Sequence, residues 1–433
     1  TAFNECPNIK KIAYPNSLKE YTYMYRGVAC PYPADDAVIE DGWIWGRNKN
    51  ALYFVPTTIE GDYSIPSSVE CIGDGAFSSC SDLTSVSIPK SVAEIGESAF
   101  KNCTSLQSII IPNSVTKIGA QAFYCCSSLN HATLPAPIKT INKSTFEECE
   151  SLKSIVIPNK IKKIDERAFY SCGALSSVEI PNSVIEIGKR AFAFCKMNTL
   201  FIPNSVTTIG NGTFAGCSLK DEVVISPSVK TIGEGAFGTD YNKTALFAIG
   251  YGVEQIGKEA FQPCDNVSIT ALVPPAEERN SFRSYSGTLN ITPDALTAGS
   301  YSSTSPWTNF TFIKPLIVPT KVEIIKINDP SLKEHQIKYQ AVITPENTSL
   351  KQVFWMSDDP TAATVDNHGV VSIDPDATGT VEITASTMYE GVMAKISLNI
   401  DKELSAIDDI IIDYIADKQN NVANPPMDIY DFR

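Results

Sequence analysis

One phrase recurs along this chain at a nearly fixed interval. Ile111 to Phe123 reads IPNSVTKIGAQAF, and close copies of it end at Phe100, Phe192 and Phe214. The phenylalanines that end the copies are Phe77, Phe100, Phe123, Phe146, Phe169, Phe192, Phe214, Phe237 and Phe261; successive ones are 22 to 24 residues apart, most often 23. A unit of this length cannot bury a core alone and must stack on its neighbours, so the repeat predicts a solenoid.

The residues inside one copy have separate physical roles. In CTSLQSIIIP, Leu106, Ile109 and Ile111 should point inward from a short strand that ends at a proline, which cannot donate to a sheet. Val115 and Ile118 predict a second short extended segment that turns the corner of the coil. The phenylalanine should then pack under the next coil. Stacked copies would form ladders of identical side chains at the strand spacing of about 4.8 Å.

A slot for small residues follows the second extended segment in every copy. It is occupied by Gly73, Gly96, Gly119, Asn142, Asp165, Gly188, Gly210, Gly233 and Gly257. Glycine, asparagine and aspartate are the residues that best tolerate a positive φ. We therefore predict that the backbone needs a positive φ at this slot, and we predict no ligand there.

The cysteines follow the repeat as well. Nine of the 12 lie three residues after a repeat phenylalanine, at Cys6, Cys80, Cys103, Cys126, Cys149, Cys172, Cys195, Cys217 and Cys264. They predict a ladder of buried, inert thiols, with an occasional bridge between neighbouring coils as the alternative. Cys30, Cys71 and Cys125 lie outside this ladder and are predicted to be exposed. The sequence does not distinguish the reduced from the oxidised state for these three residues. No metal site is predicted, since the three histidines are scattered and Cys-x-x-Cys does not occur.

The segment CTSLQSIIIPNSVTKIGAQAF resembles the 23-residue leucine-rich repeat of the BspA-like family, and the resemblance extends over about residues 63–272. It implies a curved solenoid with strands on its concave face and little regular helix. It also implies a secreted or surface protein of a host-associated bacterium or protist, and several members of the family are adhesins. No active site is implied.

Two irregular segments flank the regular repeats. Within residues 19–62, DGWIWGRNKNALYFVP predicts a hairpin that forms an irregular coil of the same solenoid. Residues 273–316 should form an irregular C-terminal cap, in which Trp307, Phe310 and Phe312 cover the last coil.

The pattern changes after the solenoid, which is expected to span residues 1–316. Short alternating runs such as KVEIIKIN and GTVEITASTM predict a small antiparallel β-sandwich over residues 317–401. VFWMSDDPTAATVDNHGVVSI resembles the group 2 bacterial immunoglobulin-like domain, in which Trp355 would be the core aromatic. Residues 402–433 form an acidic tail that resembles the start of a truncated sorting module. The predicted fold class is a leucine-rich-repeat solenoid, mainly β with short turns and 3-10 segments, followed by an all-β Ig-like sandwich.

The chain is acidic: its 433 residues carry a formal net charge of −14. This charge argues against nucleic acid or an anionic membrane as the primary partner, because both select basic surfaces. No run of 18 apolar residues occurs, so we expect no membrane insertion. The first residues, TAFNECPN, lack the basic and apolar regions of a signal peptide. We expect that peptide to have been removed or to lie upstream, and the protein to be secreted or on the cell surface.

The outward positions of the repeat strands provide the candidate binding surface. Most of them are small and neutral, but Ile110, Val156 and Phe201 are apolar, and exposed apolar side chains often mark a partner site. Together with Glu179 and His131 they are the predicted binding residues. The alternative is that all five are ordinary solvent-facing strand positions.

Other polar features have simpler explanations. Lysines recur at the corners of the coils, at Lys117, Lys139, Lys162, Lys163 and Lys230. They could face a glycan or an acidic partner, but a solvated row is the simpler interpretation. The DDP and DPDATG turns lack the ligand density of a calcium loop. No nucleophile with a base, no paired carboxylates and no phosphate loop are apparent, so neither an enzyme nor a cofactor is predicted.

Taken together, these features predict a non-catalytic adhesion or interaction protein. We expect a monomer that binds host extracellular, matrix or cell-surface proteins through the solenoid, with glycans as further ligands and the Ig-like domain as a spacer. One alternative is a carbohydrate-capture protein, in which Trp43 and Trp45 or the Ig-like domain supply aromatic platforms. The other is a structural envelope component without a specific ligand.

Overall fold

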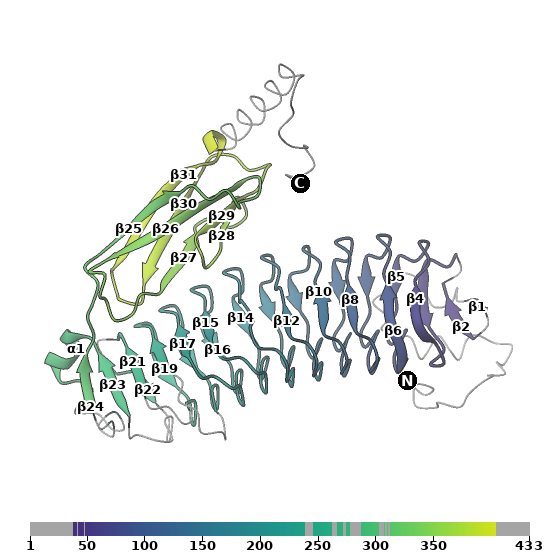
Figure 1. The fold of residues 1–433 in the computed structure, drawn as a ribbon, viewed down its shortest axis with the longest axis horizontal. Helices are drawn as coiled ribbons and strands as arrows, with labels where there is room; N and C mark the ends of the chain where they lie inside the picture. Colours follow the sequence, from purple (N-terminus) through teal and green to yellow (C-terminus); the bar gives the residue numbers. More distant parts are fainter. Residues whose placement is uncertain are drawn as a thin grey trace, which may run out of the picture. The chain divides into compact units, whose positions relative to one another are not determined.

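The computed structural model describes residues 38–40, 42–46, 48–238, 246–261, 266–271, 274–277, 287–302, 307, 310 and 312–403. It contains two compact units, Thr1–Lys314 and Pro315–Arg433. The first is a solenoid of stacked β-coils and the second is a β-sandwich, which confirms the predicted fold class (Figure 1). The predictions for Cys6, Cys30, Cys264 and the tail beyond residue 403 lie outside the described residues.

The first strand of each coil joins a parallel sheet that we call the strand face. Its first part contains β4 (Glu60–Ser64), β6 (Asp82–Ser87), β8 (Ser108–Ile110), β10 (His131–Thr133) and β12 (Ser154–Ile155). Its second part contains β15 (Leu200–Ile202), β17 (Glu222–Ile225), β19 (Leu246–Ile249), β21 (Asn266–Ile269), β23 (Thr288–Ile291) and β24 (Phe312–Pro315). Equivalent residues of successive coils pair side by side, as Ser85 pairs with Ser108 and Ser108 with His131.

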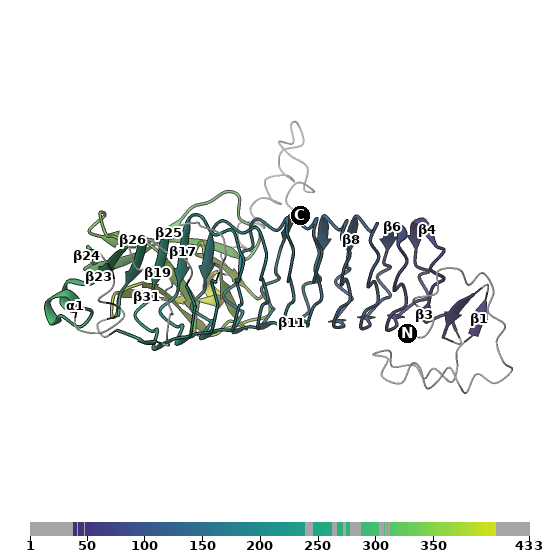
Figure 2. The same cartoon turned by 90° about the horizontal axis from the view of Figure 1, so that it is seen from below.

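A second parallel sheet, the corner face, is built from the short segment that follows each proline turn. One part contains β5 (Cys71–Ile72), β7 (Glu94–Ile95) and β9 (Lys117–Ile118), preceded by the antiparallel β1 (Val38–Glu40), β2 (Trp43–Trp45) and β3 (Ala51–Phe54). The other contains β11 (Thr140–Ile141), β13 (Lys163–Ile164), β14 (Glu186–Ile187), β16 (Thr208–Ile209), β18 (Thr231–Ile232), β20 (Gln255–Ile256) and β22 (Ala276–Glu277). β8 and β11 run along different edges of the stacked coils (Figure 2). The hairpin predicted within residues 19–62 is present as β2 and β3.

A column of stacked phenylalanine rings forms the centre of the solenoid. From Phe77 to Phe261, rings of successive coils lie 4.8–5.6 Å apart between centroids and within 11° of parallel. Leu106, Ile109 and Ile111 are buried beside the column, as predicted for the inward side of a strand. Each ring therefore depends on the coils before and after it for its burial, which explains why the sequence repeats.

The small-residue slot has a different cause from the one predicted. None of its seven glycines has a positive φ; left-handed backbone occurs two residues later, for example at Gln121 and Gly212. Glycine is needed because the preceding coil lies very close. A Cβ on Gly119 would be 2.3 Å from the backbone nitrogen of Glu97, and a Cβ on Gly96 would be equally obstructed. The prediction of positive φ was therefore wrong, and the slot is a point of close approach between coils.

Two interruptions divide the sheets. The corner face stops at β9 and resumes at β11, and the strand face stops at β12 and resumes at β15. The second interruption lies beside the one copy that is a residue short, between Phe192 and Phe214. The coil before β15 forms no regular strand on this face. It pairs with β12 through an isolated bridge between Ser154 and Ser177.

The C-terminal end of the solenoid contains the helix α1 (Pro293–Ala298), which is capped by the Thr292 hydroxyl. Trp307 and Phe310 are buried, as predicted for residues that cover the last coil. Phe312 is exposed, so the prediction was wrong for this residue. It lies on the outward side of β24, the edge strand of its sheet, where nothing in the sheet packs over it.

The second unit is an antiparallel sandwich of two sheets. One contains β25 (Lys321–Ile327), β26 (Gln336–Thr344), β29 (Val370–Ile373) and β28 (Ala363–Val365), and the other contains β27 (Val353–Ser357), β30 (Thr380–Thr387) and β31 (Met393–Asn399). Trp355, Ala363 and Val365 are buried between them, as the sequence predicts. The core therefore follows the alternation of the short runs.

Candidate binding surface

The strand face from β4 to β12 presents two parallel rows of outward side chains. One row contains Asp62, Ser85, Ser108, His131 and Ser154. The other contains Ser64, Ser87, Ile110, Thr133 and Val156. Since the strands pair in register, these residues lie at successive strand spacings of about 4.8 Å. These two rows are thus hydroxyl-rich and contain two aliphatic side chains.

Those two aliphatic side chains are unusually exposed. Ile110 is 66% exposed and Val156 is 82% exposed, while the equivalent positions of neighbouring coils hold Ser87 and Thr133. The polar neighbours show that the fold does not require an apolar residue at this position. Isolated exposed aliphatics are common on soluble proteins, but two on one otherwise polar row form a potential contact point for a partner.

The five predicted binding residues do not form a single patch. Ile110, His131 and Val156 lie on adjacent coils, and the His131 ring nitrogen Nε2 is 3.3 Å from the Thr133 hydroxyl. Glu179 is exposed, but it lies in the coil that leaves the sheet after β12. Phe201 is half-buried and belongs to β15, in the second part of the strand face. Ile110, His131 and Val156 are therefore the nucleus of the candidate surface.

One end of the candidate surface is acidic. Asp62 accepts hydrogen bonds from the hydroxyls of Ser85 at 2.6 Å and Thr84 at 2.9 Å. These hydrogen bonds lower the pKa of the Asp62 carboxyl below its ordinary value. The carboxylate is therefore ionised at any physiological pH and gives the rows a fixed negative end.

The lysines of the corner face fall into two groups. Lys117, Lys163 and Lys230 form ion pairs with carboxylates of an adjacent coil, at 3.7 Å to Glu94, 2.9 Å to Glu186 and 2.9 Å to Glu254. Lys139 and Lys162 are exposed, and in the described part of the chain no carboxylate lies within 4 Å of either ammonium. The predicted lysine row therefore contains some lysines whose charge is balanced by a carboxylate and two whose charge is not.

The cysteine ladder is reduced and buried over the described coils, as predicted. The Sγ of Cys103 donates to the carbonyl oxygen of Phe77 at 3.1 Å, and the same bond recurs at 3.1–3.2 Å up the ladder. Burial raises the pKa of the Cys80 thiol to about 12, so such thiols remain protonated and unreactive. Cys125 is free and half-buried.

Cys71 differs from the prediction of an exposed thiol. It is buried in β5 and is disulfide-bonded. Cys71 occupies the outward position of its corner strand, in register with Glu94, and it is buried because Ile44, Ala51 and Tyr53 of the hairpin pack around it. Position outside the cysteine ladder was therefore no guide to exposure.

Sequence reasoning missed two exposed apolar residues, Ile185 and Phe194, and an ion pair between the buried Glu147 and the partly exposed Arg167. Ile185 is 56% exposed on the corner face, and Phe194 lies in a turn with positive φ, with its ring edge-on to Tyr170 at 5.4 Å. Glu147 is buried and accepts a hydrogen bond from Arg167 at 2.5 Å. The sequence contained a signal for these residues, because Ile185, Phe194 and Glu147 each differ from the residues at the same slot of neighbouring copies.

The tryptophans do not provide the aromatic platforms considered for carbohydrate capture. Trp45, Trp307 and Trp355 are buried. Trp43 is half-buried, and its ring stacks on Trp45 at 5.5 Å and packs against Tyr63 at 5.0 Å. A sugar needs an open ring face, and three of these four rings have none.

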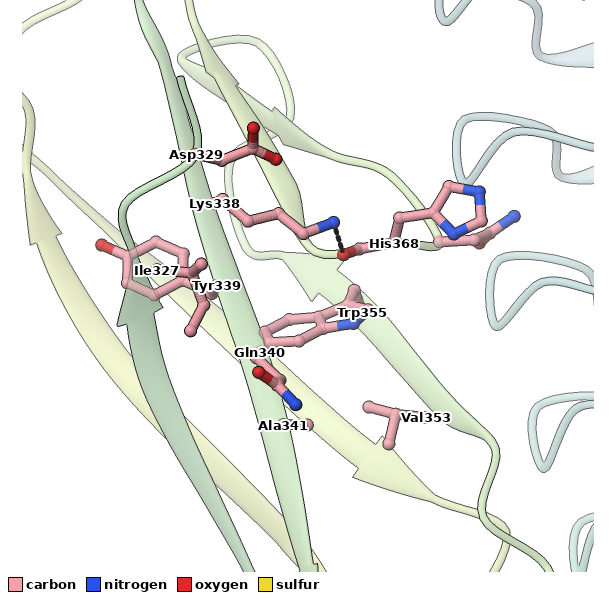
Figure 3. A pocket seen from close by; sticks show the side chains of 10 residues that line it. Ile327, Asp329, Lys338, Tyr339, Gln340, Ala341, Val353, Trp355 and His368 are labelled. Carbon is pink, nitrogen blue, oxygen red and sulfur yellow. Dashed lines mark hydrogen bonds between the residues drawn. The ribbon is translucent and has the colours of Figure 1, made fainter. Parts of the chain in front are cut away.

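The Ig-like unit has one open hollow, of about 380 Å³, lined by β26 and the turn before β29 (Figure 3). Lys338 reaches across it and donates to the carbonyl oxygen of His368. Its floor is the buried ring of Trp355, and its lining includes Asp329, Gln340, Asn367 and His368. The Lys338 ammonium uses one of its three donors in the bond to His368. In the described ranges we find no group of metal-ligating side chains and no helix of the length and hydrophobicity needed to cross a membrane.

Comparison with protein families identifies both units. Residues 53–173 and 139–268 match the BspA type leucine rich repeat region, in six copies, and residues 322–391 match the group 2 bacterial Ig-like domain. Among curated proteins none matches.

Several solved structures are similar to parts of the chain. A leucine-rich repeat protein from Eubacterium ventriosum is 31% identical over 43% of this chain and 50% of its own length, with a TM-score of 0.40. One from Bacteroides ovatus is 22% identical over 64% of this chain and 91% of its own, with a TM-score of 0.40. A leucine rich cell surface protein from Faecalibacterium prausnitzii is 23% identical over 64% and 94%, with a TM-score of 0.34. The match thus spans half the length of the Eubacterium protein.

Proposed function

Because this chain belongs to the BspA-type leucine-rich repeat proteins, with its repeats in residues 53–268 and a group 2 bacterial Ig-like domain in residues 322–391, we propose that it is a non-catalytic binding protein of the cell exterior. The strand face from β4 to β12 binds an extracellular or cell-surface protein of a host. Ile110, His131 and Val156 lie at the centre of the contact. The Ig-like domain serves as a spacer.

The exposure of Ile110 and Val156 carries this proposal. Covering one such aliphatic side chain removes it from water and contributes about 1.5–3 kcal/mol to binding. The surrounding serine and threonine hydroxyls can exchange water for hydrogen bonds to a partner at little net cost. A polar surface with two exposed apolar anchors fits a folded protein surface better than a small molecule, which needs a concave pocket.

An exterior location is supported by the cysteines. Cys71 is disulfide-bonded, and structural disulfides persist in oxidising compartments. The ladder thiols are compatible with the same environment, because their burial and raised pKa protect them from oxidation. Cys125 is the described thiol with the greatest access to solvent.

The proposal is tested with the full chain on an array of host matrix proteins, host cell-surface proteins and glycans. The test variant is Ile110→Thr/Val156→Thr, which places at both positions the residue found at Thr133. The control is Ile185→Thr, which removes an aliphatic side chain that is 56% exposed on the corner face and introduces the residue found at Thr207. We expect a protein ligand whose affinity falls at least tenfold in the test variant and less than threefold in the control, as measured by biolayer interferometry.

Two other outcomes would decide against this function. If both variants bind a ligand as tightly as the parent chain, the strand face is not the binding surface. If only glycans are captured, and the double variant has no effect on them, the carbohydrate-capture alternative replaces the proposal. Melting temperatures of all three proteins show whether any loss reflects unfolding.

A further inference from the structure

We propose that the corner face carries a second binding site, in which Lys139, Lys160 and Lys162 bind a linear acidic polysaccharide. Lys139 and Lys162 occupy the same slot of adjacent coils, since the Lys162 amide donates to the Lys139 carbonyl at 2.7 Å. Lys160 lies in the turn that leads to Lys162, with the buried Ile161 between them. All three lysine side chains are exposed. We call these residues the lysine patch.

The lysine patch is not compensated by the protein itself. Elsewhere on the corner face, Lys117, Lys163 and Lys230 each lie against a carboxylate of an adjacent coil. The slots on either side of Lys139 and Lys162 hold Thr116 and Ile185, which cannot neutralise a charge. Like charges side by side on a sheet destabilise it. The chain as a whole has a net charge of −14, but Lys139 and Lys162 lie on adjacent coils. Binding of an external anion would reduce the repulsion between their two ammonium groups.

The repeat provides an internal standard for these positions. The slot of Lys160 is a serine in six other copies, and in four of these its hydroxyl donates to the carbonyl of the equivalent valine in the preceding coil. These bonds are Ser91 to Val69, Ser114 to Val92, Ser205 to Val184 and Ser228 to Val206, at 2.5–2.8 Å. Lys160 gives up that bond, and Pro137 gives it up in the preceding copy. A departure that removes a structural bond and adds an unpaired charge is expected where function overrides folding.

The same two copies depart from the repeat at the close-approach slot. Asn142 and Asp165 stand where seven other copies have glycine. The Asn142 side-chain amide donates to the Ile118 carbonyl at 2.5 Å, in the place of the backbone bond made by Gly119 to Ile95. The corner face is interrupted at this point, between β9 and β11. The lysine patch therefore begins at a local break in the sheet.

The geometry favours a polysaccharide over an acidic polypeptide. The lysines of adjacent coils recur at the strand spacing of about 4.8 Å, which is close to the length of one sugar unit. Side chains on one face of an extended peptide recur every second residue, at about 6.6–6.8 Å, which does not match this ladder. Lysine also acts as a mobile point charge, suited to a polyelectrolyte with many equivalent groups, whereas carboxylates of a defined peptide are more often held by the arginine fork.

The test uses dextran sulfate as the polysaccharide probe, neutral dextran as its uncharged counterpart and poly-L-glutamate as the acidic polypeptide. The test variant is Lys139→Thr/Lys160→Ser/Lys162→Thr, which introduces only residues that the repeat itself uses at these slots. The control variant is Lys321→Thr/Lys326→Thr/Lys395→Thr, which removes three exposed, ion-paired lysines from the Ig-like unit. Each variant changes the net charge by three, from −14 to −17.

We expect the full chain to bind dextran sulfate but not dextran, and to lose affinity at least tenfold in the test variant and less than threefold in the control. Binding should weaken as salt increases, because exposed charges are screened. Lys139→Arg/Lys160→Arg/Lys162→Arg should retain binding, which separates charge from fold. Equal loss in both threonine variants, or no preference for dextran sulfate over dextran, overturns the site. Preferential binding of poly-L-glutamate through the same lysines assigns it to an acidic polypeptide instead.

Discussion

The Sγ of Cys126 donates a hydrogen bond to the carbonyl oxygen of Phe100, 3.1 Å away and 26 residues earlier in the chain. The thiol thus connects its own coil to the one before it, and it does so in the interior, where no water can replace it. A residue type usually discussed for its reactivity serves here as a small apolar side chain with one donor. The first two predictions depend on this relationship.

The stability of the solenoid should decrease as the pH rises above about 9. Burial raises the pKa of Cys80 to about 12, and the pKa of Cys103 and Cys149 is raised for the same reason. The unfolded chain loses these protons near pH 9, while the folded chain keeps them, so alkali favours unfolding. Each such thiol lowers the free energy of unfolding by up to about 1.4 kcal/mol per pH unit in this window. Urea titrations at pH 8, 9 and 10 measure the decrease, and Cys103→Ala should make it shallower.

Thiol reagents should distinguish the ladder from Cys125. At pH 8 the half-buried Cys125 should react with a maleimide in the native protein, whereas Cys103, Cys126 and Cys149 should react only after denaturation. The reason is access, together with the low thiolate fraction of the buried groups. Peptide mapping by mass spectrometry locates the label. Rapid labelling of the ladder in the folded chain would contradict the close packing of the coils.

Gly119→Ala should destabilise the solenoid by about 1–3 kcal/mol, because overpacking forces backbone apart. The added Cβ would lie 2.3 Å from the Glu97 nitrogen. Gly173→Ala is the matched control, since nothing lies within 4 Å of a Cβ there and its φ is not positive. That control should be neutral or slightly stabilising, by up to about 1 kcal/mol. Chemical unfolding of the two variants and the parent gives the comparison; equal effects would show that the close approach is not restrictive.

Arg167→Met should destabilise the chain by about 2–3 kcal/mol, somewhat less than for a fully buried pair because Arg167 is partly exposed. The substitution leaves the buried carboxylate of Glu147 without its cation and removes the guanidinium that lies 4.0 Å from the Tyr170 ring. Adding Glu147→Leu should restore most of the loss, because an apolar pair needs no compensation. A double-mutant cycle on unfolding free energies measures this coupling. If the double variant is no better than Arg167→Met, the cost comes from lost packing on Tyr170.

The sequence was sufficient to predict the fold because every copy of the repeat has the same pattern of buried apolar positions. Leu106, Ile109 and Ile111 mark the buried positions in one copy, and the other copies have apolar residues at the same positions. The strands of neighbouring coils can therefore pair in one register only. Trp355 was predictable from the resemblance of its segment to the group 2 Ig-like domain, because alternation alone does not distinguish it from the equally buried Phe354. The physical reason predicted for glycine at the small-residue slot was wrong. A requirement for positive φ and a requirement for close approach select the same residue, and only the position of Glu97 beside Gly119 separates them.

The candidate site was predictable only in part. Alternation along a strand identified Ile110 and Val156 as outward, and the structure leaves both in solvent. It could not show that Glu179 leaves the sheet, because its own copy, CGALSSVEIP, keeps the regular pattern of the repeat. The pairing of Lys117 and the isolation of Lys139 were also hidden, since an ion pair joins residues 23 positions apart and depends on side-chain reach as well as on the period.

The interruption between β9 and β11 has a mechanical consequence. Across the same pair of coils the strand face remains fully paired, from Ser108 with His131 to Ile110 with Thr133, while the corner face is joined through the Asn142 side chain. One edge thus keeps its full strand ladder, whereas at the corner the Asn142 amide replaces the strand pairing, and backbone bonds between the coils resume with Gln121 to Lys143. Under a load that bends the solenoid, the two coils should pivot about the strand face, and strain should concentrate at the corner. The strand-face rows would then remain unbroken while the corner lysines move apart.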